Sequence, residues 1–358
     1  MSRKLIAGLL FVVMALSMVG WSPATFQAAP AVPAAALGNL VIMSVPNLIS
    51  TAEITATTPV TQTPKVVIPF TKKNDHPVIG FSQCTMNHPW RVAMVNGNVE
   101  WAKQNWPEAE VIATDGEDKA AKQTSDVDDL LARDVDILII SPVQADPMVP
   151  AVKKAMAAGI PVIVLDRNVN TDKSVFMGSS NLEIGEAAGK FACDKLGGKG
   201  NIIEIQGTAG AGPTIDRKAG FEKGIANCAV KITASQTGDY LREPAIKFME
   251  DMLQKYPSGQ IQAVYAHNDE MALGAIKAIK AAGRQKEMIV IGIDGQNEAI
   301  DAIQAGDLAA TFVYDYAAPE GMIAAKAVYE GQPVEQNMLL PTSQIDATNV
   351  AQWIGKGF

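Results

Sequence analysis

The chain has 358 residues, of which 48% are hydrophobic and 19% charged, and its formal net charge at pH 7 is −8. This is the balance of an ordinary globular protein, which excludes an intrinsically disordered chain, and the length suffices for two domains. Lys and Arg form no cluster in the sequence, so we expect no nucleic acid among the partners.

The N-terminal residues predict export. Arg3 and Lys4 precede an apolar run over residues 5–21, and a stretch rich in small residues follows it. A short basic region, an apolar core and an A-x-A-like site are typical of a secretory signal peptide, which we place at residues 1–28. The alternative is an uncleaved anchor, because the apolar run is close to membrane-spanning length. We expect cleavage and a mature protein in the periplasm.

Residues 29–76 are rich in Ala, Pro and Thr without clear periodicity, and we expect them to form a disordered linker. The three cysteines include no C-x-x-C pair, so they predict neither a metal site nor a disulfide framework. Cys193 and Cys228 each fall near the end of a predicted helix and could pair in an oxidising compartment, whereas Cys84 is expected to be a packed residue. We expect no cofactor.

From residue 77 onward, strands and helices alternate in two successive sets. The expected strands cover residues 77–83, 109–115, 136–142, 161–167 and 175–180, then 201–207, 230–236, 261–268, 287–295 and 308–314. The expected helices cover residues 90–105, 119–133, 146–158, 182–196, 214–227, 243–256, 269–282 and 319–329. This alternation predicts parallel sheets, and the near-continuous apolar strands predict helices on both faces. The fold class is therefore α/β, with two similar doubly wound parallel-sheet lobes.

Polar residues collect where the expected strands end. They are Gln83, Asp115, Asp166, Arg167, Gln206, Asp239, Asn268, Asp269 and Asp294. In open α/β sheets, ligands bind outside the carboxyl ends of the strands, so this pattern predicts a binding site. An Asp after a strand is often only the N-cap of the next helix, which is the alternative for Asp115 and Asp269.

The pair Asp166-Arg167 is not explained by capping, because no helical pattern follows it directly. A carboxylate beside a guanidinium offers acceptors and donors to adjacent sugar hydroxyls; an internal salt bridge is the alternative. Three aromatic residues, Trp90, Tyr240 and Tyr314, fall at expected loop mouths, where they could pack on the C–H face of a sugar or belong to the core.

Residues 207–221 follow a strand and open a helix, as a phosphate-binding loop does. Their spacing is G-x-x-G-x-G rather than G-x-G-x-x-G, so we expect a turn that directs Arg217 into the cleft. Signatures of serine hydrolases and zinc proteases are missing from the sequence. Asp166 and Asp294 could form a glycosidase pair, but two acidic strand ends are weak grounds for one, and we expect no enzyme.

Several of these segments match one known family. The matching motifs are FSQ, PVIVLDR, EIQGTAGAGPTIDRKAGF, SQTGDY, YAHNDEMALGAIKAIKAAG and GIDG. From residue 77 to the end, the chain resembles the type I periplasmic sugar-binding proteins of bacterial ABC importers, the class that includes ribose-binding protein. The similarity seen in these motifs is greatest to the galactofuranose-binding member.

The resemblance implies a set of ligand contacts. They are Gln83, His88, Trp90, Arg91, Asp166, Arg167, Arg217, Tyr240, Asn268, Asp294 and Tyr314. Ribose binders have Gln where this chain has Tyr314, and they carry two aromatic residues where this chain, like the galactofuranose-type protein, has Trp90 and Arg91. These departures favour another monosaccharide, such as a hexose in its furanose form.

The resemblance also implies how the chain divides between the lobes. The N-terminal lobe would comprise residues 77–180 and 315–341, and the C-terminal lobe residues 181–314 and 342–358. Crossovers near residues 180–181, 314–315 and 341–343 would form a hinge that closes on the ligand. The implied function is that of a monomer that captures a monosaccharide and delivers it to the membrane subunits of an ABC permease. A sensory receptor for a sugar-like signal is the alternative, and a sugar-processing enzyme is a weaker one.

Overall fold

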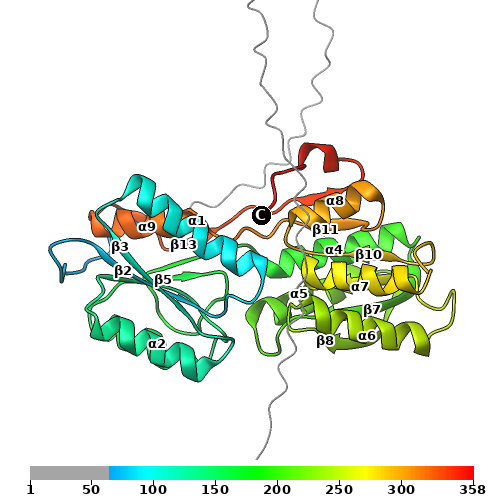
Figure 1. Ribbon diagram of the computed structural model, residues 1–358, viewed down its shortest axis with the longest axis horizontal. Coiled ribbons are helices and arrows are strands. Elements are labelled where there is room, and N and C mark those ends of the chain that lie inside the picture. The colour runs from blue at the N-terminus through cyan, green and yellow to red at the C-terminus, as the bar shows by residue number, and fades with distance from the viewer. Residues whose placement is uncertain (1–63) are drawn as a thin grey trace, which may run out of the picture. The chain divides into compact units, whose positions relative to one another are not determined.

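The computed structural model describes residues 64–358, in which two six-stranded sheets are covered by helices (Figure 1). The first sheet comprises β2 (Val78–Gln83), β3 (Glu110–Asp115), β4 (Ile137–Ser141), β5 (Val162–Leu165), β6 (Val175–Gly178) and β13 (Asn337–Leu339). Its helices are α1 (Pro89–Asn105), α2 (Ala120–Ala132), α3 (Val149–Ala157) and α9 (Glu320–Tyr329). β2, β4 and β5 are buried along their whole length because helices cover both sheet faces.

The second sheet comprises β7 (Lys199–Gln206), β8 (Ala229–Thr237), β9 (Ala263–Ala266), β10 (Ile289–Ile291), β11 (Ala310–Phe312) and β14 (Gln344–Asp346). Its helices are α4 (Asn181–Lys195), α5 (Gly212–Ile225), α6 (Arg242–Lys255), α7 (Asp269–Ala281) and α8 (Asn297–Ala305). A short 3₁₀ helix, η1 (Val350–Gln352), packs near α8. The predicted α/β class with two parallel-sheet lobes is confirmed.

The two sheets share one strand order. The first runs β3-β2-β4-β5-β6-β13 and is parallel throughout, and the second runs β8-β7-β9-β10-β11-β14 with only β14 antiparallel to its neighbour. In each lobe the chain starts at the second strand and turns back, so the order reverses between β2 and β4 and between β7 and β9. Such a reversal leaves a crevice at the carboxyl ends of the strands, where doubly wound proteins bind ligands.

The chain passes between the sheets three times, after β6, after β11 and after β13. As a result, the sixth strand of each sheet comes from the C-terminal region. The residue pattern predicted five strands in each lobe and showed neither β13 nor β14, although the resemblance implied a terminal strand in the C-terminal lobe. Each of these has only three residues, too few to show a periodic pattern.

The prediction of a disordered linker over residues 29–76 is wrong for the last of these residues. β1 (Lys65–Val66) pairs antiparallel with β12 (Val334–Glu335), and the backbone N–H of Lys73 donates to the Asp136 carboxylate at 2.7 Å. An extended segment can pair with a short strand far along the chain, and two paired residues carry no signal in the sequence. The rest of the expected linker and the expected signal peptide lie outside the described residues.

Helices α4 and α5 approach each other at glycines. A Cβ atom at Gly185 would lie 2.3 Å from the carbonyl oxygen of Arg217, and one at Gly220 would lie 2.1 Å from that of Leu182. Cys193 and Cys228, whose pairing the sequence left open, form a disulfide that connects the end of α4 to the chain just after α5. Cys84 is free and buried. The glycines therefore fix the spacing of two helices whose N-terminal ends reach the site described below.

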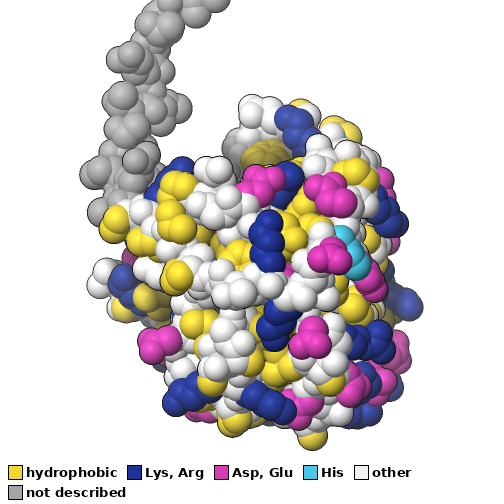
Figure 2. Space-filling view, turned by 90° about the vertical axis from the view of Figure 1, so that its left-hand side faces the viewer, with side chains coloured by type: hydrophobic (Ala, Val, Ile, Leu, Met, Phe, Trp, Pro, Cys, Tyr) yellow, Lys and Arg dark blue, Asp and Glu magenta, His cyan; other side chains and the backbone are white. Residues whose placement is uncertain are grey.

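The surface of the first lobe carries mixed charge. On the face shown in Figure 2, Lys and Arg side chains are interspersed with Asp and Glu side chains and with hydrophobic ones. Within residues 64–358, none of the helices combines the length and the apolar character needed to cross a membrane.

Candidate ligand-binding site

The carboxyl ends of both sheets border a small cavity of about 20 Å³. Its walls are formed by His88, Trp90, Arg91, Asp166, Pro213, Arg217, Tyr240, Asn268, Asp294 and Tyr314. Ligand pockets usually measure roughly 300–1,000 Å³, so the side chains of these walls already fill most of the space that a ligand would need. The walls combine charged groups with aromatic rings, and within residues 64–358 no group of His, Cys, Asp and Glu could hold a metal ion.

Asp166, which follows β5, organises the wall that the first lobe provides. One carboxylate oxygen accepts from the Arg91 guanidinium and, at 3.1 Å, from the Ser141 hydroxyl, and the other accepts from the Tyr314 hydroxyl. Burial alone would raise the pKa of Asp166, but Arg91, Arg167 and the hydrogen bond from Tyr314 outweigh it and lower the pKa. Asp166 is therefore ionised at neutral pH.

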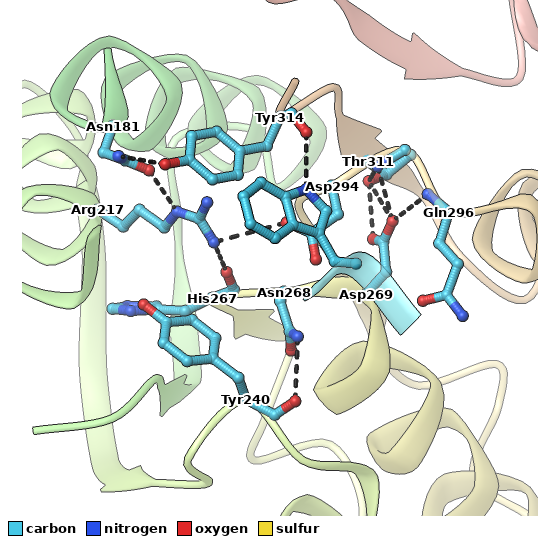
Figure 3. Close-up of polar contacts among 12 residues, drawn as sticks. Asn181, Arg217, Tyr240, His267, Asn268, Asp269, Asp294, Gln296, Thr311 and Tyr314 are labelled. Carbon is cyan, nitrogen blue, oxygen red and sulfur yellow. Dashed lines mark hydrogen bonds and ion pairs between the residues drawn. The ribbon is translucent and has the colours of Figure 1, made fainter. Parts of the chain in front are cut away.

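Arg217, on α5, organises the wall that the second lobe provides (Figure 3). Its Nε–H donates to the Asn181 side-chain oxygen at 2.8 Å, one Nη donates to the His267 carbonyl, and the same Nη lies 3.8 Å from the Asp294 carboxylate. Burial raises the pKa of Asp294 well above its ordinary value; Arg217 opposes this rise and Asp269 adds to it. This wall therefore combines a buried guanidinium with a carboxyl that holds its proton unusually well.

Two aromatic residues join the lobes at one side of the cavity. The rings of Trp90 and Tyr314 stack with centroids 5.1 Å apart, and the Trp90 indole N–H donates to the Tyr314 carbonyl at 2.9 Å. Tyr240 lies in the second lobe, where its hydroxyl is 2.8 Å from the Thr214 hydroxyl. A Cβ atom at Gly207 would lie only 1.9 Å from the Tyr240 ring, so a glycine at this position makes room for it.

The strand ends hold several cavity residues in the left-handed backbone region. The φ angles are 64° at Asp166, 62° at Tyr240 and 133° at Asp294. Non-glycine residues rarely adopt such angles, which cost of order 1–3 kcal/mol each and persist where the surrounding structure enforces them. Three of the positions that direct polar side chains into the cavity are thus also strained.

Several buried polar atoms of the first lobe have no hydrogen-bond partner within residues 64–358, and three of them lie at or just behind the wall of the cavity. They are Nδ1 of His88, Nε of Arg91 and Nε of Arg167. Burial, together with the neighbouring Arg91, lowers the pKa of His88 well below its ordinary value, so its ring is neutral. A buried polar atom without a partner costs about 1–3 kcal/mol, and a ligand rich in hydroxyls can supply partners to the two of these atoms that belong to cavity-lining residues, His88 and Arg91.

Nine of the eleven residues expected at the site line the cavity, and Gln83 and Arg167 do not. The Gln83 side chain points into the first lobe, where it accepts from the Cys84 N–H at 2.9 Å and contacts the Met94 sulfur. Arg167 lies just behind the wall and donates to the Val143 carbonyl at 2.7 Å, which holds the loop after β4. Alternation along a strand decides which side chains face inward, and the resemblance alone could not fix it at these positions.

The structure adds Pro213, Ser141 and Asn181 to the expected residues. Pro213 lines the cavity at the start of α5, and the glycine-rich turn before it was the available signal. Ser141 ends β4 and contacts both Arg91 and Asp166. Asn181 lies behind Arg217 and Tyr314. Neither of the last two stands out in the sequence, since a Ser or Asn beside a strand or helix end is common.

The roles expected for Asn268 and Asp269 are partly reversed. Asn268 caps α7, with its side-chain oxygen accepting from the Met271 N–H at 3.0 Å, while it also lines the cavity. Asp269, expected as the cap, accepts from the backbone N–H groups of Gly295 and Gln296 at 2.9 Å each and from the Thr311 hydroxyl (Figure 3). Asp269 therefore holds the loop that carries Asp294.

Comparison with known proteins identifies close relatives of this chain. A family model described as the periplasmic binding protein domain matches residues 79–332. The ribose import binding protein of Bacillus subtilis (strain 168) is 37% identical over 269 residues, covering 74% of this chain and 85% of the relative. The galactofuranose-binding protein of Escherichia coli (strain K12) is also 37% identical, over 238 residues, covering 64% of this chain and 74% of the relative.

A solved structure, the fructose-binding periplasmic domain of a hybrid two-component system, is 35% identical with a TM-score of 0.74, covering 78% of this chain and 94% of its own. Both of these relatives are 37% identical to this chain. Percentage identity therefore does not decide between the galactofuranose-binding protein, to which we expected the greater similarity, and the ribose-binding one.

Proposed function

Because this chain belongs to the periplasmic binding protein family, whose members bind solutes and are not enzymes, we propose that it captures a monosaccharide between its lobes and delivers it to an ABC permease. The observation that carries the proposal is the cavity itself. It is small, it is shared by the two lobes, and it joins carboxylates and guanidinium groups to stacked aromatic rings. Export to the periplasm and a monomeric state belong to the same proposal.

The polar groups of the cavity suit a neutral ligand with several hydroxyls. Arg91 and Arg217 offer donors, the Asp166 carboxylate offers an acceptor, and the Trp90 and Tyr240 rings offer faces for C–H groups. A pentose or a hexose, including a hexose in its furanose form, presents hydroxyls and C–H faces of this kind. Two relatives, which bind ribose and galactofuranose according to their names, support this range.

Contacts between the lobes support capture by closure. Tyr314 in the second lobe contacts Asp166 in the first, and a ligand in the cavity touches both lobes as well. A ligand can shift an equilibrium between open and closed forms only by interacting better with one of them, and contacts to both lobes exist only in the closed form. Closure then provides the signal by which a permease distinguishes loaded from empty protein.

The proposal is tested by a thermal-shift screen of the mature protein over pentoses, hexoses and polyols, followed by calorimetry. We expect a rise in melting temperature with at least one monosaccharide and loss of that rise in the Arg217→Ala variant. The variant Arg284→Ala serves as the control, because Arg284 lies away from the cavity and pairs with Glu287. No response to any sugar, or turnover of the sugar during incubation, would contradict the proposal.

A sensory receptor is the second candidate. It is favoured by the similarity to a sugar-binding domain that belongs to a two-component system. Uptake of the bound sugar, labelled with carbon-14, separates the two roles. Loss of uptake when the gene is deleted indicates transport, whereas unchanged uptake together with a lost transcriptional response to the sugar indicates sensing.

A further inference from the structure

Asn181 is buried behind the cavity wall, at the first residue of α4 and directly after the first passage between the lobes. It does not line the cavity. Its side-chain oxygen accepts from Arg217 Nε–H at 2.8 Å, and its side-chain nitrogen donates to the Tyr314 hydroxyl at 3.2 Å (Figure 3). One amide therefore contacts two residues of the proposed sugar site at once.

These contacts fix the direction of a chain of hydrogen bonds. Arg217 Nε–H can only donate, so the oxygen of the Asn181 amide must face it and the NH₂ group must face Tyr314. The Tyr314 oxygen then accepts from Asn181, which leaves its own O–H free to donate to the Asp166 carboxylate. This series of hydrogen bonds runs from Asp166 in the first lobe to Arg217 in the second. It passes through Tyr314 and Asn181, which lie at the crossovers.

The direction matters for what Asp166 can offer a ligand. One oxygen of its carboxylate accepts from Arg91 and Ser141, and the other accepts from Tyr314. A carboxylate has about four acceptor positions, so roughly one is left for a sugar hydroxyl. If the Tyr314 hydroxyl turned toward Asn181 instead, Asp166 would lose a donor from the other lobe.

The packing of α4 on α5 makes the contact possible. The glycines described above let the helices approach until the Gly185 Cα faces the Arg217 backbone. At this spacing the short Asn181 side chain reaches Nε of Arg217, while α4 begins immediately beside Tyr314. Ser180 caps the same helix by accepting from the Glu183 N–H, and it touches neither of these side chains.

We propose that Asn181 is a positioning residue for the sugar site: by donating to Tyr314 and accepting from Arg217, it directs the Tyr314 hydroxyl onto Asp166 across the lobes and so couples ligand binding to closure. The inference rests on the proposed function and adds to it a residue outside the cavity. Asn181 then contributes to the affinity of the site for the sugar and not to which sugar the site selects.

The test is a double-mutant cycle between positions 181 and 314. The variant Asn181→Asp keeps an acceptor for Arg217 but has no donor for Tyr314, so the tyrosine hydroxyl is drawn away from Asp166. Calorimetry uses D-ribose, L-arabinose, D-fructose and D-galactose as probes, with the sugar that the wild type binds most tightly carried through all variants. In the wild-type background, we expect Asn181→Asp to weaken binding about tenfold, which corresponds to the loss of roughly one hydrogen bond with a charged partner. In the Tyr314→Phe background, we expect the same substitution to weaken binding less than about threefold.

Ser180→Ala is the matched control, because it removes the cap of α4 while leaving the side chains of Asn181 and Tyr314 in place. We expect it to lower the melting temperature and to leave affinity within about twofold. An equal loss from Asn181→Asp in both backgrounds, or no loss in the wild type, would overturn the role of Asn181 alone. A wild type that binds none of the sugars would overturn the proposed function and this inference with it.

Discussion

The hydroxyl of Tyr314 donates a hydrogen bond to the carboxylate of Asp166, which joins the end of the second sheet to a strand end of the first. Tyr314 also stacks on Trp90 and lies under the Arg217 guanidinium, whose central carbon is 4.4 Å from the ring centre. One side chain at a crossover thus touches residues from both walls of the cavity. The contacts that join the lobes are therefore also contacts within the site.

Tyr314→Phe removes the hydroxyl and keeps the ring. We expect sugar affinity to fall about tenfold, because Asp166 loses a buried donor while the stack on Trp90 remains. Isothermal titration calorimetry measures the change. Tyr316→Phe is the control, since the Tyr316 ring contacts the edge of Trp90 from outside the cavity. Equal affinities of the wild type and Tyr314→Phe would contradict a role for this hydrogen bond.

Arg91→Ala and Arg167→Ala are expected to differ. Arg91 forms a buried ion pair with Asp166 inside the cavity, whereas Arg167 holds a loop behind it. Arg91→Ala removes a charged donor from the cavity, and a hydrogen bond with a charged group contributes about 1.5–3 kcal/mol, so affinity should fall by roughly 30- to 100-fold. Arg167→Ala should reduce it by about tenfold. Binding measured by calorimetry on both variants decides the order, and a larger loss from Arg167→Ala would reverse our assignment.

Gln144 connects the lobes away from the cavity. Its side-chain nitrogen, in the loop after β4, donates to the Ala209 carbonyl in the loop after β7 at 3.1 Å. We expect Gln144→Ala to increase the dissociation rate of the sugar about two- to tenfold, since a contact that forms on closure is lost without change to the cavity. Stopped-flow fluorescence measures the rate. Gln104→Ala, which removes a hydrogen bond within α1, should leave it unchanged.

The buried carboxyl group of Asp269 should make the free energy of unfolding depend on pH. Burial raises its pKa to about 7, against the hydrogen bonds that it accepts from Gln296, Thr311 and Gly295. The folded state therefore holds a proton that the unfolded state releases near pH 4, so stability decreases as pH rises toward 7. We expect wild-type protein to lose roughly 2 kcal/mol between pH 5 and pH 7 from this group.

Urea unfolding at several pH values tests this dependence, with Asp269→Asn as the comparison because it does not titrate. The difference in unfolding free energy between the two proteins should shrink as pH rises from 5 to 7. A difference independent of pH would show that Asp269 has an ordinary pKa in the folded protein.

The disulfide Cys193–Cys228 is expected to support stability without affecting the sugar. It closes a loop of 35 residues, for which loop-closure entropy gives about 2–4 kcal/mol. The Cys193→Ser/Cys228→Ser variant should lose this amount in urea unfolding and keep its affinity within about twofold, because the bond lies at the far end of α4 from Asn181. Cys84→Ala, which removes the free buried thiol, is the control for loss of a cysteine. A large loss of affinity would show that the disulfide positions the site.

The sequence alone determined the α/β class, the order of the long elements and most of the cavity. Apolar strands such as 137–141 are unambiguous because helices on both faces demand a continuous hydrophobic run. Asp166 and Asp294 could be recognised because they interrupt such runs where parallel strands deliver side chains to a site. These signals are local: each is contained within a few residues of the chain.

Tertiary structure decided the features that depend on contacts between distant residues. Gln83 and Arg167 fall behind the wall, Asn268 rather than Asp269 caps α7, and Asn181 connects Arg217 to Tyr314. None of these roles is written in the neighbouring sequence, because an amide or a carboxylate has many local partners available. Which partner it takes depends on how two sheets and two closely packed helices bring their ends together.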